Sequence, residues 1–106
     1  MAWVMLFVAG ILEVVWAYTM KLSEGLTRPG PLVITFVAMT MSIGLLALAM
    51  KSLPLGTAYT VWTGIGAVGA FLVGIVVLGE AVTVMRVTAA VLIVSGLVLM
   101  KLSSPA

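Results

Sequence analysis

The sequence predicts an all-α integral membrane protein with four transmembrane helices, and its composition, charge spacing and turn residues all favour this fold class. Of the 106 residues, 64% are apolar and only 8% are charged, whereas an average soluble domain carries about a quarter charged residues. The few charges lie between long apolar stretches, with Gly or Pro nearby where helices end. Such a chain cannot cover a water-facing surface, so the bilayer must be its solvent.

Four spans follow from the positions of the charges, because an unpaired charge is costly in hydrocarbon. The uncharged runs 29–50 and 52–79 are each longer than the roughly 20 residues that cross a bilayer. Arg86 stands near the start of the last span, where its long side chain can reach the headgroups. We expect one transmembrane domain over 1–106, with helices at about 2–21, 31–50, 57–78 and 84–101.

The first span is interpreted as a retained helix and not as a cleaved signal peptide. A signal peptide has a basic start and an uninterrupted apolar centre. This span has no Lys or Arg before Lys21 and carries Glu13 near its middle.

The missing residue types exclude several classes of function. The chain has no His and no Cys, which removes the commonest zinc ligands, thiol chemistry and the usual nucleophile pairs. Its five basic residues are scattered without a basic run, so nothing indicates a nucleic-acid surface. We therefore expect no enzyme activity, no metal or other cofactor and no nucleic-acid partner.

The Lys and Arg residues give the chain almost no preferred orientation. With four helices, the N-terminus, the second connector and the C-terminus share one side of the membrane. Orientation follows an excess of Lys and Arg on the cytoplasmic side. That excess is one residue here, and the α-amino group levels it, so the sequence predicts insertion both ways up; the alternative is that a one-charge bias orients every copy. The basic residues are Lys51 and Lys101 on the N-terminal side and Lys21, Arg28 and Arg86 on the other.

Glu13 is the main candidate for a functional residue, because it is an acid in the middle of a membrane span. A charge there costs at least about 2.5 to 3.5 kcal/mol, which the carboxyl group can lower by staying protonated or by holding a cation. These two states compete for one group, which is the basis of proton-coupled cation exchange. The alternative is a Glu that hydrogen-bonds to a neighbouring helix for packing.

Aromatic and small residues share the faces that would surround this acid. Gly10 and Trp16 lie one helical turn from Glu13; Gly10 keeps that face open, and Trp16 adds a flat ring with an N–H donor. Tyr59 and Trp62 lie on one face of the third helix. Aromatic faces attract cations by about 0.5 to 2 kcal/mol, so we expect an inward aromatic wall; the alternative for Tyr59 is an interfacial belt residue.

Other polar and small residues have both a structural and a functional interpretation. Ser42 is one of three hydroxyl residues of the second helix, and such side chains usually bond back to a carbonyl of their own helix. Gly64 and Gly66 either bend the third helix or let helices approach closely. Gly96 lies in a fourth helix rich in Val, Leu and Met, which indicates an assembly surface.

One copy of the chain is too small to form a transport site. Four short helices cannot enclose a polar cavity and also offer two alternating gates. Two copies inserted in opposite orientations would form an inverted repeat with the site at the midplane. We therefore expect a homodimer in which two Glu13 side chains titrate as a coupled pair.

Over essentially its whole length the chain resembles the small multidrug resistance transporters. The resemblance depends on four helices, a single membrane-embedded Glu in the first helix, and the run Ala-Tyr-Thr-Val-Trp-Thr-Gly-Ile-Gly at 58–66. The run Glu-Val-Val-Trp-Ala at 13–17 resembles the guanidinium exporter branch, in which a Trp follows the Glu by three. The quaternary-ammonium branch usually has a small residue at that position.

The resemblance implies an antiparallel, dual-topology homodimer in a bacterial inner membrane that exchanges guanidinium for protons. It implies that Glu13 binds substrate and proton, and that Ser42 and Trp16 position its carboxylate. It further implies that Tyr59 orders the network and couples the subunits, while Trp62 walls the site. Two alternatives remain open: an exporter of quaternary-ammonium or polyaromatic cations in the same family, and a non-transporting membrane assembly subunit.

Overall fold

The structure is a computed structural model that describes residues 2–103. These residues form helices and connectors, without a strand. The helices are α1 (Ala2–Leu22), α2 (Pro29–Ala49), α3 (Leu55–Val76) and α4 (Val84–Ser103). Each is long and apolar enough to cross a membrane. The predicted all-α fold class with four membrane spans is therefore confirmed.

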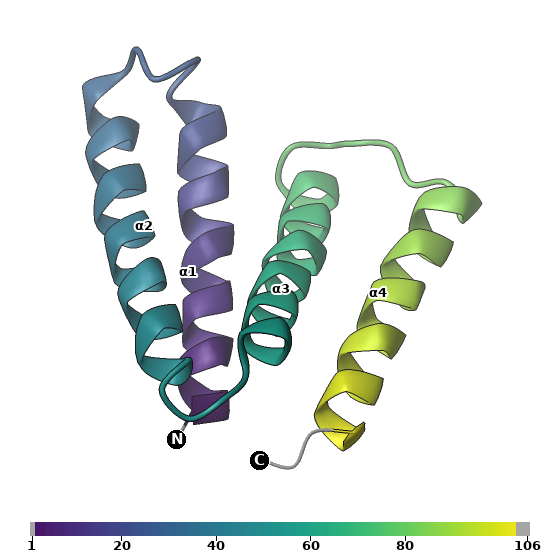
Figure 1. Ribbon diagram of the computed structural model, residues 1–106. Coiled ribbons are helices and arrows are strands. Elements are labelled where there is room, and N and C mark those ends of the chain that lie inside the picture. The colour runs from purple at the N-terminus through teal and green to yellow at the C-terminus, as the bar shows by residue number, and fades with distance from the viewer. Residues whose placement is uncertain (1, 104–106) are drawn as a thin grey trace.

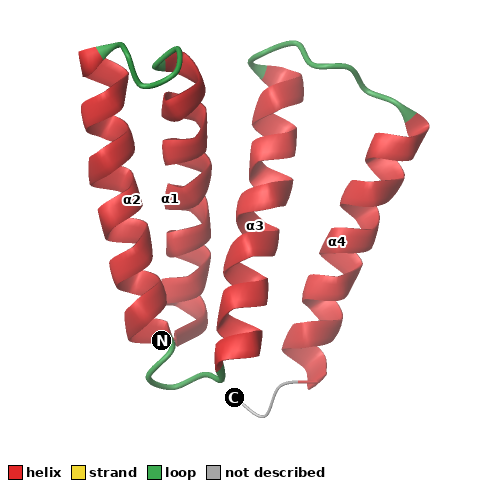
Figure 2. Cartoon of the chain, turned by 45° about the horizontal axis from the view of Figure 1, so that its top comes forward, coloured by secondary structure: helices red, strands yellow, loops and turns green. Residues whose placement is uncertain are grey.

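The helices run alternately up and down in a single layer (Figures 1 and 2). α1 packs against both α2 and α3, and α4 packs beside α3. The start of α1, the α2–α3 connector and the end of α4 lie at one end of the layer, and the other two connectors lie at the opposite end (Figure 1). The Cα atoms extend over 43 × 34 × 16 Å, so the layer is little more than one helix thick.

Prolines start two of the helices. α2 begins at Pro29, two residues before the expected start, because a proline in the first turn loses no intrahelical hydrogen bond. α3 begins at Leu55, directly after Pro54, whose extended backbone (ψ 151°) forms the N-cap. The sequence expectation placed these starts at 31 and 57, because it assigned Pro29 and Gly30, and Leu55 and Gly56, to the connectors.

The α3–α4 connector is shaped by a glycine and a threonine. α3 ends at Val76, two residues earlier than expected, and Gly79 then takes a left-handed backbone (φ 70°), which glycine adopts without steric cost. Thr83 Oγ1 accepts a hydrogen bond from the backbone N–H of Arg86 at 3.1 Å. This bond satisfies one of the free N–H groups at the start of α4.

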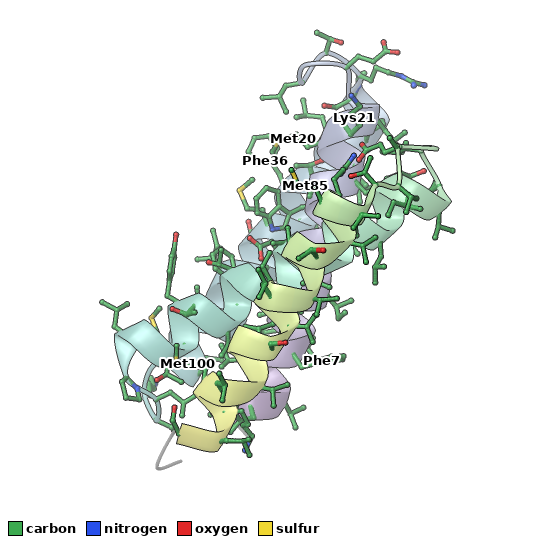
Figure 3. The ribbon with its side chains drawn as sticks, turned by 90° about the vertical axis from the view of Figure 1, so that its right-hand side faces the viewer. Phe7, Met20, Lys21, Phe36, Met85 and Met100 are labelled. Atoms are coloured by element: carbon green, nitrogen blue, oxygen red, sulfur yellow. The ribbon has the colours of Figure 1, made fainter. Side chains whose placement is uncertain are left out.

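The buried core lies at the end of the layer that carries the α2–α3 connector. Its members come from α1, α2, the connector and α3, and are Leu6, Leu46, Ala49, Leu53, Ala58 and Val61. Over Val84–Ser103, α4 has no buried residue. Large apolar side chains elsewhere are exposed, among them Phe7 (Figure 3). Lipid is the solvent that accepts such a surface, and the small core fixes how α1 and α3 pass one another near Glu13.

Candidate functional site

Glu13 lies in the middle of α1 with its carboxyl group against the backbone of α3. Gly66 of α3 is so close that a β-carbon there would overlap the Glu13 carboxyl group. The Glu13 side chain is half-buried, and its Oε1 is buried with no hydrogen-bond partner among the described residues. A buried acceptor without a donor costs free energy, so this position favours an occupant that supplies a proton or an N–H group.

Trp16 adds a second unpartnered polar atom on the same face of α1. Its Nε1 is also buried with no hydrogen-bond partner in the described part of the chain, and it follows Glu13 by three residues, which places the two on neighbouring turns. An acceptor and a donor are thus both left unsatisfied at this level of α1. The expected role of Trp16 in positioning the carboxylate stays a prediction.

Glycines allow α1 and α3 to approach closely around Glu13. A β-carbon on Gly10 would lie 2.5 Å from Cγ2 of Ile65, and one on Gly69 would overlap the side chain of Val14. Small residues at helix contacts in membranes permit this close packing. The acid is therefore held at the crossing of α1 and α3, with no room for a larger residue on either side.

The remaining glycines that the sequence singled out have different surroundings. α3 is an uninterrupted helix across Gly64 and Gly66, which supports the packing interpretation over a bend in this conformation. A β-carbon on Gly64 would lie 2.5 Å from Cδ2 of Leu97 in α4, so Gly64 sets the contact between α3 and α4. A β-carbon on Gly96 would meet no described atom within 4 Å, so Gly96 lies on the open surface of α4.

Ser42 connects three helices through its hydroxyl group. Its Oγ donates to the backbone carbonyl of Ala9 on α1 at 2.6 Å and accepts the indole N–H of Trp62 on α3 at 2.9 Å. Thr40, by contrast, donates to the carbonyl of Phe36 in its own helix at 2.8 Å, which is the usual behaviour of such residues. Because Ser42 is fully buried, its two bonds fix the orientation of the Trp62 ring.

Tyr59 and Trp62 form an aromatic pair on α3. Their ring centroids are 5.6 Å apart and their planes are tilted by 49°, a geometry typical of favourable ring contacts. Trp62 is half-buried, whereas Tyr59 is 53% exposed. The exposed ring of Tyr59 is therefore accessible to lipid or to a second copy of the chain.

The structure assembles the predicted site residues into two groups. One joins Ser42, Trp62 and Tyr59, and the other joins Glu13 and Gly66. Within residues 2–103 no hydrogen bond links the two groups. The Ser42 hydroxyl is engaged by the Ala9 carbonyl and the Trp62 indole N–H, and the expectation that Ser42 positions the carboxylate of Glu13 stays a prediction.

Sequence reasoning missed a buried hydrogen bond between α1 and α2. Thr19 Oγ1 and Thr35 Oγ1 lie 2.7 Å apart, and Thr35 Oγ1 also donates to the carbonyl of Pro31 at 2.8 Å. Thr19 Oγ1 likewise has the carbonyl of Trp16 in its own helix as an acceptor at 3.2 Å, so one hydroxyl bonds back to its helix while the other donates across the pair. Facing threonines in two consecutive spans of a hairpin are the signal that could have found this contact.

The carboxyl group of Glu13 and the aromatic rings near it can bind a cation or a proton, but the described residues do not supply the ligands of a metal ion. Among residues 2–103, no cluster of three His, Cys, Asp or Glu side chains could hold a metal ion. What the site offers is one carboxylate with an unsatisfied oxygen, one indole N–H and flat aromatic rings. A small cation with N–H groups matches this combination of charge, acceptor and ring faces.

Comparison with known proteins agrees with this chemistry. The family model of the Small Multidrug Resistance protein matches residues 1–103. A protein of Escherichia coli (strain K12) named guanidinium exporter is 57% identical over 104 residues, which cover 98% of this chain and 99% of the relative. Guanidinium exporters of Yersinia pestis and Proteus vulgaris are 55% and 51% identical, each over 98% of this chain and 100% of the relative. The chain therefore belongs to the small multidrug resistance protein family, as a multi-pass membrane protein with four spans.

Proposed function

We propose that this chain exports guanidinium ions across the bacterial inner membrane in exchange for protons. Relatives that match nearly the whole chain carry the name guanidinium exporter, which supports the substrate class. The observation that carries the proposal is the buried, unpartnered Oε1 of Glu13 in the middle of a membrane span. An acid so placed needs either a proton or a cation to neutralise it.

The chemistry of guanidinium fits the groups at this site. The ion is planar, and its N–H groups form a bidentate charge-assisted pair with a carboxylate. Glu13 supplies the carboxylate, and the flat rings of Trp16 and Trp62 supply faces that attract a cation. The Trp62 indole N–H is held by Ser42, so the ring keeps one orientation while substrates enter and leave.

Exchange follows from competition between a proton and a cation for the same carboxylate. A guanidinium ion that binds to ionised Glu13 requires the proton to leave, and a returning proton releases the ion. An inward proton gradient then drives the export of the cation. This coupling needs no cofactor, because protonation and substrate binding are alternative states of one group.

The transport unit in this proposal is an antiparallel homodimer. The single layer of helices is 16 Å in its thinnest direction and α4 buries no residue, so one chain offers a large apolar surface to a second copy. Two oppositely inserted copies form an inverted repeat with the substrate site between them. Two Glu13 carboxyl groups then share one cavity and titrate as a coupled pair.

A reconstituted system tests the proposal directly. Proteoliposomes loaded with guanidinium should take up protons as guanidinium leaves, and Glu13→Gln should lower the exchange rate at least a hundredfold. Glu24→Gln is the matched control, because Glu24 is an exposed acid in the α1–α2 connector. A fully active Glu13→Gln variant would overturn the mechanism.

The same assay separates the alternatives. Transport of tetraphenylphosphonium without guanidinium would favour the drug-exporting branch. A large ring in detergent, measured by native mass, together with no transport of either cation would favour an assembly subunit. A dimer that transports guanidinium supports the proposal.

A further inference from the structure

The α3–α4 connector already holds a guanidinium group, that of Arg86. Its Nη2 lies 3.5 Å from Oε1 of Glu80, and its Nη1 donates to the backbone carbonyl of Ala81 at 3.1 Å. Its guanidinium carbon lies over the ring of Phe71, 5.3 Å from the centroid. A carboxylate, a carbonyl oxygen and an aromatic face together recognise the charge, the N–H edge and the flat face of a guanidinium group.

Glu80 also borders a cavity between α1 and α3. This cavity has a volume of about 170 Å³. Its lining includes Val14 and Ala17 on α1 and Ala70 and Gly74 on α3, and the small residues Ala17, Ala70 and Gly74 leave space between the helices. The Glu80 carboxyl group lies so close to Gly74 that a β-carbon there would overlap it. Because Val14 directly follows Glu13, the cavity extends from the connector toward the level of the buried acid.

The contact between Glu80 and Arg86 is weak enough to be replaced. The two side chains are 43% and 41% exposed, and exposed ion pairs contribute little to stability. The Arg86 side chain can leave without breaking a helix, since its backbone N–H stays bonded to Thr83 Oγ1. A tethered group competes with a free ion through its high local concentration, so free guanidinium binds here measurably only when Arg86 moves away.

Lys21 lowers the affinity of the Glu80 position for a cation. It lines the cavity together with Glu80 and Tyr18, and it lies at the same end of the molecule as Met85 at the start of α4 (Figure 3). Its positive charge opposes the entry of a second cation. A cation held at Glu80 is therefore bound more loosely than one held at Glu13.

We propose that Glu80 forms a second, low-affinity guanidinium subsite at the α3–α4 connector, between the α1–α3 cavity that Glu80 lines and the α3–α4 cavity that Phe71 and Arg86 line. The Arg86 side chain is the tethered occupant of this subsite. An incoming ion takes the place of the Arg86 guanidinium group, with its N–H groups on Glu80 and on the Ala81 carbonyl and its face on Phe71. The identity of the ligand rests on the proposed function. The residues that form the subsite are separate from those around Glu13.

Binding measurements on the full-length protein in detergent test this subsite in a Glu13→Gln background. The probe is radiolabelled guanidinium in equilibrium dialysis. We expect Glu13→Gln/Arg86→Gln to bind guanidinium at least tenfold more tightly than Glu13→Gln alone, and we expect Glu80→Gln added to that pair to remove the gain. Glu24→Gln added in place of Glu80→Gln is the matched control and should keep the gain.

Two further measurements separate recognition from simple charge attraction. Tetramethylammonium, a cation without N–H groups, should bind to the Glu13→Gln/Arg86→Gln protein at least tenfold more weakly than guanidinium. Phe71→Leu in the same background should weaken guanidinium binding several-fold, with the helical content by circular dichroism unchanged. Equal binding of the two cations would overturn the subsite as a guanidinium site.

The failure of this proposal is distinguishable from failure of the transport mechanism. If Arg86→Gln exposes no guanidinium binding, or if Glu80→Gln leaves the binding intact, the subsite does not exist, whatever Glu13 does. If Glu13→Gln retains full transport, the mechanism at Glu13 is wrong, while the binding comparison still depends on Glu80 alone.

Discussion

The carboxyl group of Glu13 on α1 lies against the α-carbon of Gly66 on α3, with no room for a β-carbon between them. This contact couples the position of the acid to the distance between two helices that are far apart in the chain. A change in that distance, as in a switch between inward-open and outward-open forms, must move the carboxyl group relative to α3. In the proposed mechanism, this contact links substrate binding at Glu13 to the movement of α1 and α3.

Gly66→Ala should therefore impair transport. The added methyl group overlaps the Glu13 carboxyl group, so either the side chain or α3 must shift, and we expect the initial rate of guanidinium exchange in proteoliposomes to fall at least tenfold. Gly44→Ala is the matched control, because a β-carbon there meets no described atom within 4 Å. A wild-type rate for Gly66→Ala would show that the close approach has no functional role.

Ser42→Ala should destabilise the protein and loosen the Trp62 ring. The change removes two buried hydrogen bonds and leaves the Ala9 carbonyl and the Trp62 indole N–H without partners. Hydrogen bonds between membrane helices are each worth about 0.6 to 2 kcal/mol, so the loss of two should lower the free energy of unfolding in mixed micelles by about 1 to 4 kcal/mol. Thr40→Ala, which loses only a bond within its own helix, should cost less than half as much.

Guanidinium binding should weaken as the pH falls. Protonated Glu13 is neutral and no longer attracts a cation. If guanidinium binding displaces one proton, its affinity should fall about tenfold for each pH unit. If it displaces both protons of a coupled pair, its affinity should fall by up to about a hundredfold for each pH unit. At high pH, where both carboxyl groups are ionised, the affinity should level off. Isothermal titration calorimetry from pH 5 to 9 measures the guanidinium affinity. The control Glu24→Gln should keep the pH dependence of the wild type. A wild-type affinity that does not change with pH would contradict competition between proton and guanidinium.

The orientation of the chain should respond to single charges. The wild type carries two Lys or Arg residues on the N-terminal side and three on the other, and small excesses decide orientation. With the α-amino group counted on the N-terminal side, the wild type is balanced at three against three. Ser52→Lys with Arg28→Gln changes this count to four against two, and Thr27→Lys with Lys51→Gln changes it to two against four. We expect each double variant to insert in one orientation and to be inactive alone, and the two together to restore transport.

Labelling of engineered cysteines measures these orientations, since the natural chain has none. A cysteine placed at Ser103 should react from both sides of the membrane in the wild type and from one side in each charge variant. Full activity of a single-orientation variant on its own would contradict the antiparallel dimer.

Much of the fold was predictable because the bilayer allows so few solutions. Only helices and closed barrels satisfy their backbone hydrogen bonds in lipid, so apolar runs separated by charges are enough to predict four helices. The bounds were less accurate where proline starts a helix, as at Pro29, since the same residue also ends helices. The choice of Glu13 as the main candidate functional residue depended on its charge and depth alone, with no knowledge of its neighbours, and its role stays a prediction.

The sequence by itself determined the four spans, the depth of the acid and the near balance of basic residues. Only the tertiary structure decided that the Ser42 hydroxyl binds Ala9 and Trp62 instead of its own helix, that Gly66 lies against Glu13, and that Arg86 lies on Glu80 and Phe71. The physical reason is that these helices are apolar on all sides, so the pattern of residues does not reveal which face of one helix meets which face of another. These contacts depend on how each helix is rotated and how the helices cross, and side-chain packing across the whole layer determines both.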